Sequence, residues 1–195
     1  EQPRHSVELS EYSIGKYPIT NQQYQAFVKE GGKSPEGWDG DQYPQGKDAH
    51  PVVNVSWEDA MLYVKWLNEK TKKNYRLPTE AEWEKAARGE DGRIWSWGNE
   101  FGEKNANTAE LQLNDTTPVG QFSPQGDSPY GNADMLGNVW EWCDDWFDEK
   151  EYKNRKDGVK DPQGTQTGTY RVLRGGSFGN SRDYVRCAYR SRNLP

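Results

Sequence analysis

The stretch Gly131-Asn132-Ala133-Asp134-Met135-Leu136-Gly137-Asn138-Val139-Trp140-Glu141-Trp142 carries the most information about the fold of this chain. It places two acidic side chains, Asp134 and Glu141, around a glycine-bearing turn. Carboxylates and main-chain carbonyls are the hard oxygen ligands that calcium binds, about six to eight at a time. The spacing therefore permits a calcium site at Asp134 and Glu141, with the carbonyls of Gly137 and Val139 as further ligands. The alternative is an Asp that caps a helix and a Glu on the surface.

Three helix starts precede this stretch, and each pairs an N-cap hydroxyl with an acid or amide three residues later. The pairs are Thr20 with Gln23, Ser56 with Asp59, and Thr79 with Glu82. Apolar residues follow each start at helical spacing, and glycines end the first and third runs. The sequence therefore predicts three amphipathic helices in the first half of the chain.

Beyond Gly89 the helical periodicity is replaced by Gly, Pro, Asn and Asp at short intervals. We expect loops and short strands there, and an exposed polar loop at Glu149–Lys160. Strand-like pieces are Val7–Leu9, Tyr12–Ile14, Tyr170–Leu173 and Tyr184–Ala188. The expected fold class is α+β, with few helices, short strands and much irregular loop, in a single domain over residues 1–195.

The composition narrows the classes of partner. Of 195 residues, Lys+Arg 25 against Asp+Glu 31 give a formal net charge of -6, which disfavours nucleic-acid binding. Hydrophobic residues make up only 32% of the chain. Because aromatic residues make up 13%, and each buries a large area, the chain can still form a core. Apolar runs are too short to cross a bilayer. The two cysteines and the lack of a leader in Glu1–His5 predict a cytoplasmic location, with a removed secretion signal as the alternative.

Six ordered motifs resemble the formylglycine-generating-enzyme family, also called sulfatase-modifying factors. They are Gly15–Asn21, Pro51–Trp57, Arg76–Glu84, Trp97–Asn99, Gly137–Trp142 and Arg174–Phe178. The resemblance covers roughly residues 4 to 195 and implies a variant of the C-type lectin fold. Family members usually continue to a Gly-Phe-Arg strand, so this final strand is expected to be missing from residues 1–195.

The resemblance also implies calcium positions, residue by residue. The first set is the one that the spacing already indicates: Asp134, Gly137, Val139 and Glu141. The second set comprises Asn107, Thr108 and one of Asn114 or Asp115, of which we take Asp115. The loop that carries this second set is shorter than in the family. Both calcium ions are expected to be structural.

The resemblance implies no catalytic residue in this chain. Family enzymes use oxygen and a copper(I) ion between two cysteine thiolates to convert a cysteine of a client sulfatase to formylglycine. The matching positions are Asn180 and Val185, which offer no thiolate, so copper is not expected. Cys143 is expected to be a small buried side chain. The alternative function is a formylglycine-generating oxidase with an atypical site that includes Cys187.

The C-terminal residues favour a binding surface. Tyr anchors among adaptable Asn, Ser and Asp are typical of antibody-like paratopes. The predicted ligand-binding residues are Phe178, Asn180, Ser181, Asp183, Tyr184, Tyr189, Ser191 and Asn193. The region resembles the mutated surface of variable proteins of diversity-generating retroelements. We therefore expect a bacterial domain with a protein or peptide ligand, free or joined to a signalling or defence protein. The alternative is a solvated surface strand.

Overall fold

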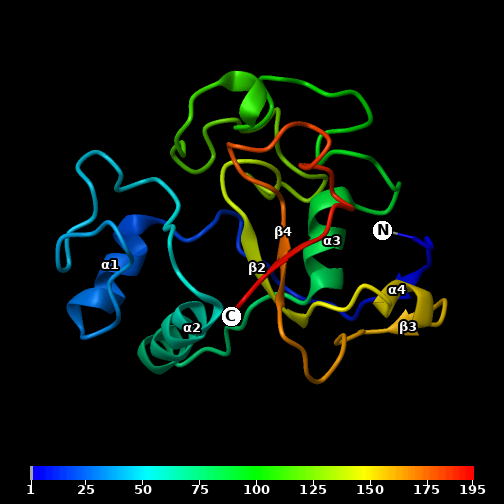
Figure 1. Cartoon of the computed structure of the whole chain (residues 1–195), viewed down its shortest axis with the longest axis horizontal. Helices are drawn as coiled ribbons and strands as arrows, with labels where there is room; N and C mark the ends of the chain where they lie inside the picture. The colour runs from blue at the N-terminus through cyan, green and yellow to red at the C-terminus, as the bar shows by residue number, and fades with distance from the viewer. Residues whose placement is uncertain (1) are drawn as a thin grey trace.

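The three predicted helices are confirmed in the computed structural model, which describes residues 2–195 (Figure 1). They are α1 (Asn21–Lys29), α2 (Trp57–Thr71) and α3 (Glu80–Arg88). Each begins with the expected capping box, in which the N-cap hydroxyl accepts from a backbone N–H three residues later and the N-cap N–H donates back to that residue's side chain. Because these bonds are local, they place all three helix starts at the predicted residues.

A three-stranded antiparallel sheet lies at the centre of the fold. Its order is β2 (Glu141–Trp146), β4 (Arg171–Arg174) and β5 (Ser191–Asn193). The register places Glu141 opposite Arg174 and Leu173 opposite Ser191. Figure 1 shows α3 beside this sheet, with α1 and α2 on its other side. The turn that precedes β2 packs into the same core as α3 and β4, because Met135 and Leu136 belong to the buried cluster around Trp83 and Val172.

Two strand predictions are wrong, and one loop prediction is right only in that most of its segment is exposed. Tyr184–Ala188 forms turns, in which Val185 and Cys187 are buried, and Tyr12–Ile14 lies outside any strand. The segment Glu149–Lys160, expected as an exposed loop, contains α4 (Glu151–Asn154) and β3 (Val159–Lys160) and buries Tyr152. β1 (Val7–Glu8) pairs in parallel with β3.

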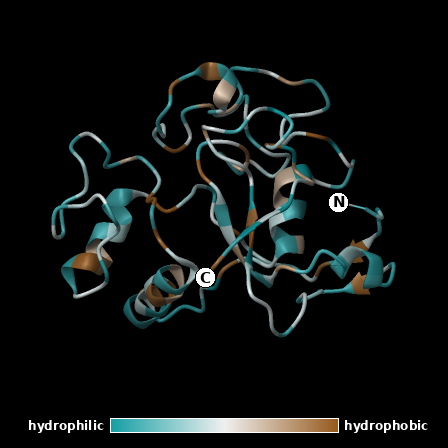
Figure 2. Cartoon of the chain, in the orientation of Figure 1, coloured by the Kyte–Doolittle hydropathy of each residue, from teal (hydrophilic) through white to brown (hydrophobic). Residues whose placement is uncertain are grey.

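The core consists of two aromatic-rich clusters. The larger one surrounds Trp83, which is fully buried, and includes Leu136 and Val172. The smaller one joins α1 and α2 through Tyr24 and Tyr63, whose rings stack at a centroid distance of 5.2 Å. Figure 2 shows β4 and parts of α1 and α2 as hydrophobic segments among largely hydrophilic loops. Among residues 2–195, no helix combines the length and apolarity needed to cross a membrane.

Candidate functional site

The turn from Asp134 to Glu141 requires left-handed backbone. Asp134, Gly137 and Asn138 have φ values of 56°, 75° and 61°. Asp and Asn tolerate this region better than other residues with a Cβ. Gly137 is needed for a second reason, since a Cβ there would clash with the carbonyl oxygen of Asn107. The segment around Asn107 is therefore in direct backbone contact with this turn, just before β2.

Two partly buried carboxylates lie on this turn. Glu141 Oε2 accepts a hydrogen bond of 2.9 Å from Trp83 Nε1, and Asp134 Oδ2 accepts one of 2.5 Å from the N–H of Gly120. Burial raises the pKa of Glu141 to about 8, with a smaller contribution from the charge of Asp134. Burial also raises the pKa of Asp134. A cation between the two carboxylates would relieve both shifts.

The predicted carbonyl ligands lie between these carboxylates in the chain. The carbonyl of Asn138 accepts from the N–H of Phe178, whereas none of the loop hydrogen bonds described for residues 2–195 ends at the carbonyl of Gly137 or Val139. Within the same residues, no group of three or more His, Cys, Asp or Glu side chains is placed to hold a metal. A hard cation at this turn would therefore depend on carbonyl oxygens as well as on the two carboxylates.

The second predicted set is brought together only in part. Asn107 and Thr108 are buried, and the Oδ1 atom of Asn107 is buried without a hydrogen-bond partner, so it is an oxygen that a cation could use. The carboxylate of Asp115 is directed elsewhere: Oδ2 lies 2.5 Å from Lys47 Nζ, and Oδ1 accepts from the N–H of Thr116 at 2.7 Å. Asp115 reaches Asn107 through its main-chain carbonyl, which accepts from Nδ2 of Asn107 at 2.8 Å.

Asn138 is a positioning residue to which sequence reasoning assigned no role. Its N–H donates to the carbonyl of Asn107 at 2.8 Å. Its side-chain Oδ1 accepts from the N–H of Thr117 at 2.9 Å, and its Nδ2 donates to the carbonyl of Thr117 at 3.1 Å. The available signal in the sequence was a single amide between Gly137 and the apolar pair Val139 and Trp140. Asn138 thus fastens the 107–117 segment to the turn.

The structure does not bring all the predicted ligand-binding residues together. Tyr184 is 48% exposed, and its ring packs edge-on against Tyr189 at a centroid distance of 5.3 Å. The rings of Tyr189 and Trp140 pack at a centroid distance of 6.1 Å. We call Trp140, Tyr184 and Tyr189 the aromatic cluster. Ser191 and Asn193 lie apart from it on β5, opposite Leu173 and Arg171 of β4.

A groove of about 510 Å³ adjoins the aromatic cluster. Its lining includes Trp38, Val53, Trp140, Trp142 and Phe178. Trp140 thus belongs to both surfaces, a role that the sequence analysis did not assign to it. Phe178 is the one predicted ligand-binding residue that lines the groove. The groove and the cluster share Trp140 and so form one continuous surface, in which aromatic side chains lie among polar and charged ones such as Lys47 and Asp115.

The two positions at which the resemblance implies copper ligands have other roles. Asn180 Oδ1 accepts from both the N–H and the hydroxyl of Ser177, at 3.0 and 2.8 Å, so this side chain caps its own loop. Val185 is fully buried. The two thiols, Cys143 and Cys187, are unpaired and fully buried, as predicted for Cys143. Burial raises the pKa of Cys187 to about 12.

Comparison with known proteins places this architecture among related sequences. Residues 1–195 match the family model described as sulfatase-modifying factor enzyme 1-like domain. The formylglycine-generating enzyme of Thermomonospora curvata is 34% identical, over 100% of this chain and 81% of that protein. The serine/threonine-protein kinase pkn1 of Chlamydia caviae is 35% identical over 100% of this chain, which spans only 32% of the kinase.

Two solved structures resemble the whole fold. Treponema denticola variable protein 1 is 28% identical, with a TM-score of 0.81 over 98% of this chain and 82% of that one. PvdO from Pseudomonas aeruginosa is also 28% identical, with a TM-score of 0.75 over 92% of this chain and 73% of that one. The predicted α+β fold of the formylglycine-generating-enzyme type is confirmed.

Proposed function

The chain belongs to the sulfatase-modifying factor enzyme 1-like family, and from this premise we propose that it is a non-catalytic domain that binds a protein or peptide. The observation that carries the proposal is the partly exposed aromatic cluster, which shares Trp140 with the groove. Tyr and Trp supply large, rigid contact area at a low cost in conformational entropy, and they dominate binding energy at interfaces. Phe178 extends this surface into the groove.

The chemistry of the loop supports binding over oxidation. Copper(I) requires soft thiolate ligands, and the two positions that would carry them hold an amide and a buried valine. Cys187 and Cys143 are the remaining thiols of the sequence. Burial raises the pKa of both thiols, which opposes formation of the thiolate.

The relatives suggest two settings for such a domain. The solved relative from Treponema denticola is described as a variable protein, and we propose that the exposed residues of this chain's C-terminal loop are diversified in the same sense. The chain spans about a third of the pkn1 kinases, which supports a module joined to a signalling protein.

We propose calcium as the structural cofactor. The residues present fit it, because two partly buried carboxylates with raised pKa values flank two carbonyl groups on one turn. Asp134, Gly137, Val139 and Glu141 would hold the ion, which would supply positive charge beside the core. Asn107 and Thr108 offer oxygens for a second ion. Trp83 orients Glu141 through its indole N–H.

A peptide-display selection tests the binding proposal. Peptides selected on the wild-type protein are measured against a Tyr184→Ala/Tyr189→Ala variant, and we expect a loss of affinity of tenfold or more. Tyr75→Ala is the matched control, because Tyr75 is 40% exposed and its side chain lies outside the aromatic cluster and the groove. Equal affinity for wild type and double variant would refute the proposal.

The alternative, an oxidase, is favoured by one observation, the 34% identity to a formylglycine-generating enzyme over 81% of its length. It predicts oxygen uptake when copper(I)-loaded protein meets a cysteinyl peptide, and loss of that uptake in Cys187→Ser. Our proposal predicts no uptake above that of a denatured sample in either protein.

A further inference from the structure

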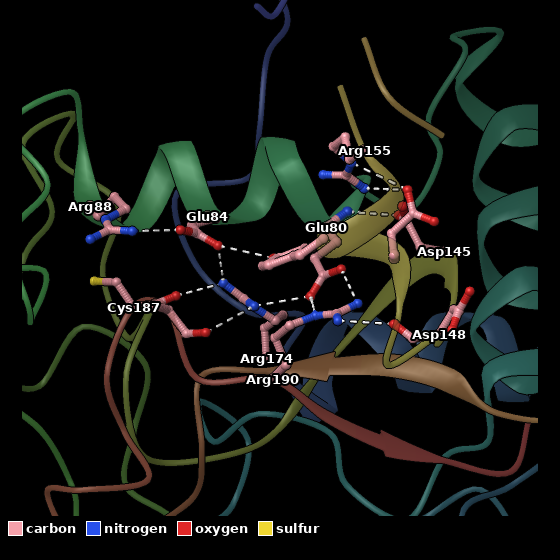
Figure 3. A network of polar contacts seen from close by, with 12 residues as sticks. Glu80, Glu84, Arg88, Asp145, Asp148, Arg155, Arg174, Cys187 and Arg190 are labelled. Carbon is pink, nitrogen blue, oxygen red and sulfur yellow. Dashed lines mark hydrogen bonds and ion pairs between the residues drawn. The ribbon is translucent and has the colours of Figure 1, made fainter. Parts of the chain in front are cut away.

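The loop that carries Tyr184 and Tyr189 of the aromatic cluster lies between two arginines. Arg174 is the last residue of β4, and Arg190 directly precedes β5. Figure 3 shows the two guanidinium groups on either side of one carboxylate, that of Glu80 from α3. Arg174 Nη1 lies 3.0 Å from Glu80 Oε1, and Arg190 reaches both carboxylate oxygens, with Nε at 2.6 Å and Nη2 at 2.8 Å. A single residue of α3 therefore joins the two ends of the loop.

All three side chains of this junction are removed from water. The side chains of Arg174, Glu80 and Arg190 are 0%, 2% and 6% exposed. Charge-assisted bonds in such surroundings are strong, and loss of one partner leaves an uncompensated buried charge. Glu84 supplies the second negative charge, with Oε2 at 2.6 Å from Arg174 Nη2. The junction is thus an ordered network of buried charges.

The network also reaches the backbone of the loop. Arg174 Nη2 donates to the carbonyl of Cys187 at 2.6 Å. At the start of the loop, a Cβ at Gly176 would lie 2.5 Å from Val185 Cγ1, so the two halves of the loop are in close contact. The outer residues have a different environment, since Tyr184 is 48% exposed. The inner side of the loop is therefore held by α3, while its outer side is open to a partner.

We propose that Glu80 is the positioning residue of the ligand face, which comprises the aromatic cluster and the exposed residues of the 175–189 loop. Glu80 closes this loop through Arg174 and Arg190. This inference rests on the proposed function for what the loop binds, but not for the order of the loop itself. A loop whose ends are fixed loses less conformational entropy when it binds, which raises affinity. Fixed loop ends also allow the exposed residues to differ in sequence while the buried closure stays the same.

Glu84 provides the matched control. It lies one turn further along α3 and binds Arg174, but its other ion pair is with Arg88 of the same helix, at 2.6 Å. Glu84 therefore does not join the two ends of the loop. If buried charge alone matters, Glu80→Gln and Glu84→Gln should loosen the loop equally. If loop closure matters, only Glu80→Gln should do so.

Hydrogen exchange followed by NMR tests the proposal without a ligand. The reporters are the N–H groups of Asn180, Tyr184 and Tyr189, each bonded to a carbonyl three residues earlier in the loop. In Glu80→Gln we expect these amides to exchange at least tenfold faster, while amides of β4 and α2 change less than threefold. In Glu84→Gln the exchange rates of the loop, β4 and α2 amides should all change less than threefold. Retained loop protection in Glu80→Gln, or equal loss throughout the chain, would overturn the proposal.

A second variant decides the question if Glu80→Gln does not fold. Arg190→Met keeps the Glu80–Arg174 pair and a long side chain beside Phe147, but it removes the guanidinium that lies 4.7 Å from the Phe147 ring centroid and binds Glu80, and with it the second end of the closure. We expect the same selective loss in the three loop amides, and unchanged loop protection in this variant would overturn the proposal. Tyr184→Ala/Tyr189→Ala should weaken peptide binding while Asn180 keeps its protection. The failure of the binding proposal is therefore separable from the failure of the positioning proposal.

Discussion

Trp83 Nε1 donates a hydrogen bond of 2.9 Å to Glu141 Oε2, so the centre of the larger core cluster and the turn before β2 are in direct contact. Trp83 is fully buried on α3, and its ring also lies 5.2 Å from the guanidinium of Arg174. One indole therefore contacts both the predicted calcium turn and the closure of the ligand-face loop. A change in the charge of Glu141 acts directly on this core.

Calcium removal should lower the thermal stability of the protein. Binding to the native state alone at a free calcium concentration about 100 times Kd adds about 2.7 kcal/mol. For a chain of this size that corresponds to a shift of roughly 5–10 °C in Tm. Differential scanning calorimetry with and without a chelator measures the shift.

Glu141→Gln is the control for this prediction, because the amide keeps an oxygen for Trp83 and loses the charge that calcium needs. The calcium-dependent rise in Tm should disappear in this variant. An undiminished response to calcium would show that the ion binds elsewhere.

Asp115→Asn should change calcium affinity at the Asp134–Glu141 turn by less than threefold. The carboxylate of Asp115 pairs with Lys47, and its side chain is 60% exposed, so its loss should cost less than about 1 kcal/mol of stability. Titration calorimetry gives the affinity and the number of ions bound. Loss of one bound ion in this variant would instead assign the Asp115 carboxylate to a second calcium.

Gly137→Ala should be strongly destabilising, by about 3 kcal/mol or more. The new methyl group would meet the carbonyl oxygen of Asn107, and φ at this position is 75°. Gly131→Ala is the matched control, since its φ is 81° but a Cβ there meets no atom within 4 Å. Urea unfolding should show a cost of about 1 kcal/mol for the control. Similar costs in the two variants would mean that the Asn107 contact is not rigid.

The features that sequence reasoning predicted correctly depend on neighbours in the chain. A capping box joins residues three apart, so Ser56 with Asp59 is readable without any tertiary structure. β2 was missed because Asp145 interrupts its apolar pattern. Asp145 is 4% exposed, and it accepts a 2.7 Å hydrogen bond from the N–H of Glu80, a contact that depends on tertiary packing.

The ligand face could be predicted only in part for the same reason. The alternation in Tyr184–Ala188 resembles a strand, but it arises from turns in which Val185 packs against Gly176. Nothing in the sequence indicates that the side chain of Asn180 has a partner within the protein, yet its Oδ1 atom accepts hydrogen bonds from the N–H and the hydroxyl of Ser177. Trp140 joins the aromatic cluster only through a contact with Tyr189, far along the chain.

The buried Asp145 predicts a specific dependence of stability on pH. Burial raises the pKa of Asp145 to about 6, and the charge of Glu80 adds to the rise. The unfolded chain releases this proton near the ordinary value of 3.8. Between these values the native state binds more protons than the unfolded state, so the contribution of Asp145 to the free energy of unfolding falls as pH rises. Above pH 6 its contribution is constant.

Asp145→Asn should remove this dependence, because the amide oxygen can still accept from the N–H of Glu80 and does not titrate. We expect the wild-type free energy of unfolding, relative to the variant, to fall by at most about 3 kcal/mol between pH 4 and pH 6, and then to stay level. Carboxylates with lowered pKa values, such as Glu82 and Glu84, act in the opposite direction but equally in both proteins. Urea unfolding at several pH values measures the difference. A difference that is flat from pH 4 to 6 would mean that Asp145 is ionised in the native state at pH 4, with its charge offset by the N–H of Glu80.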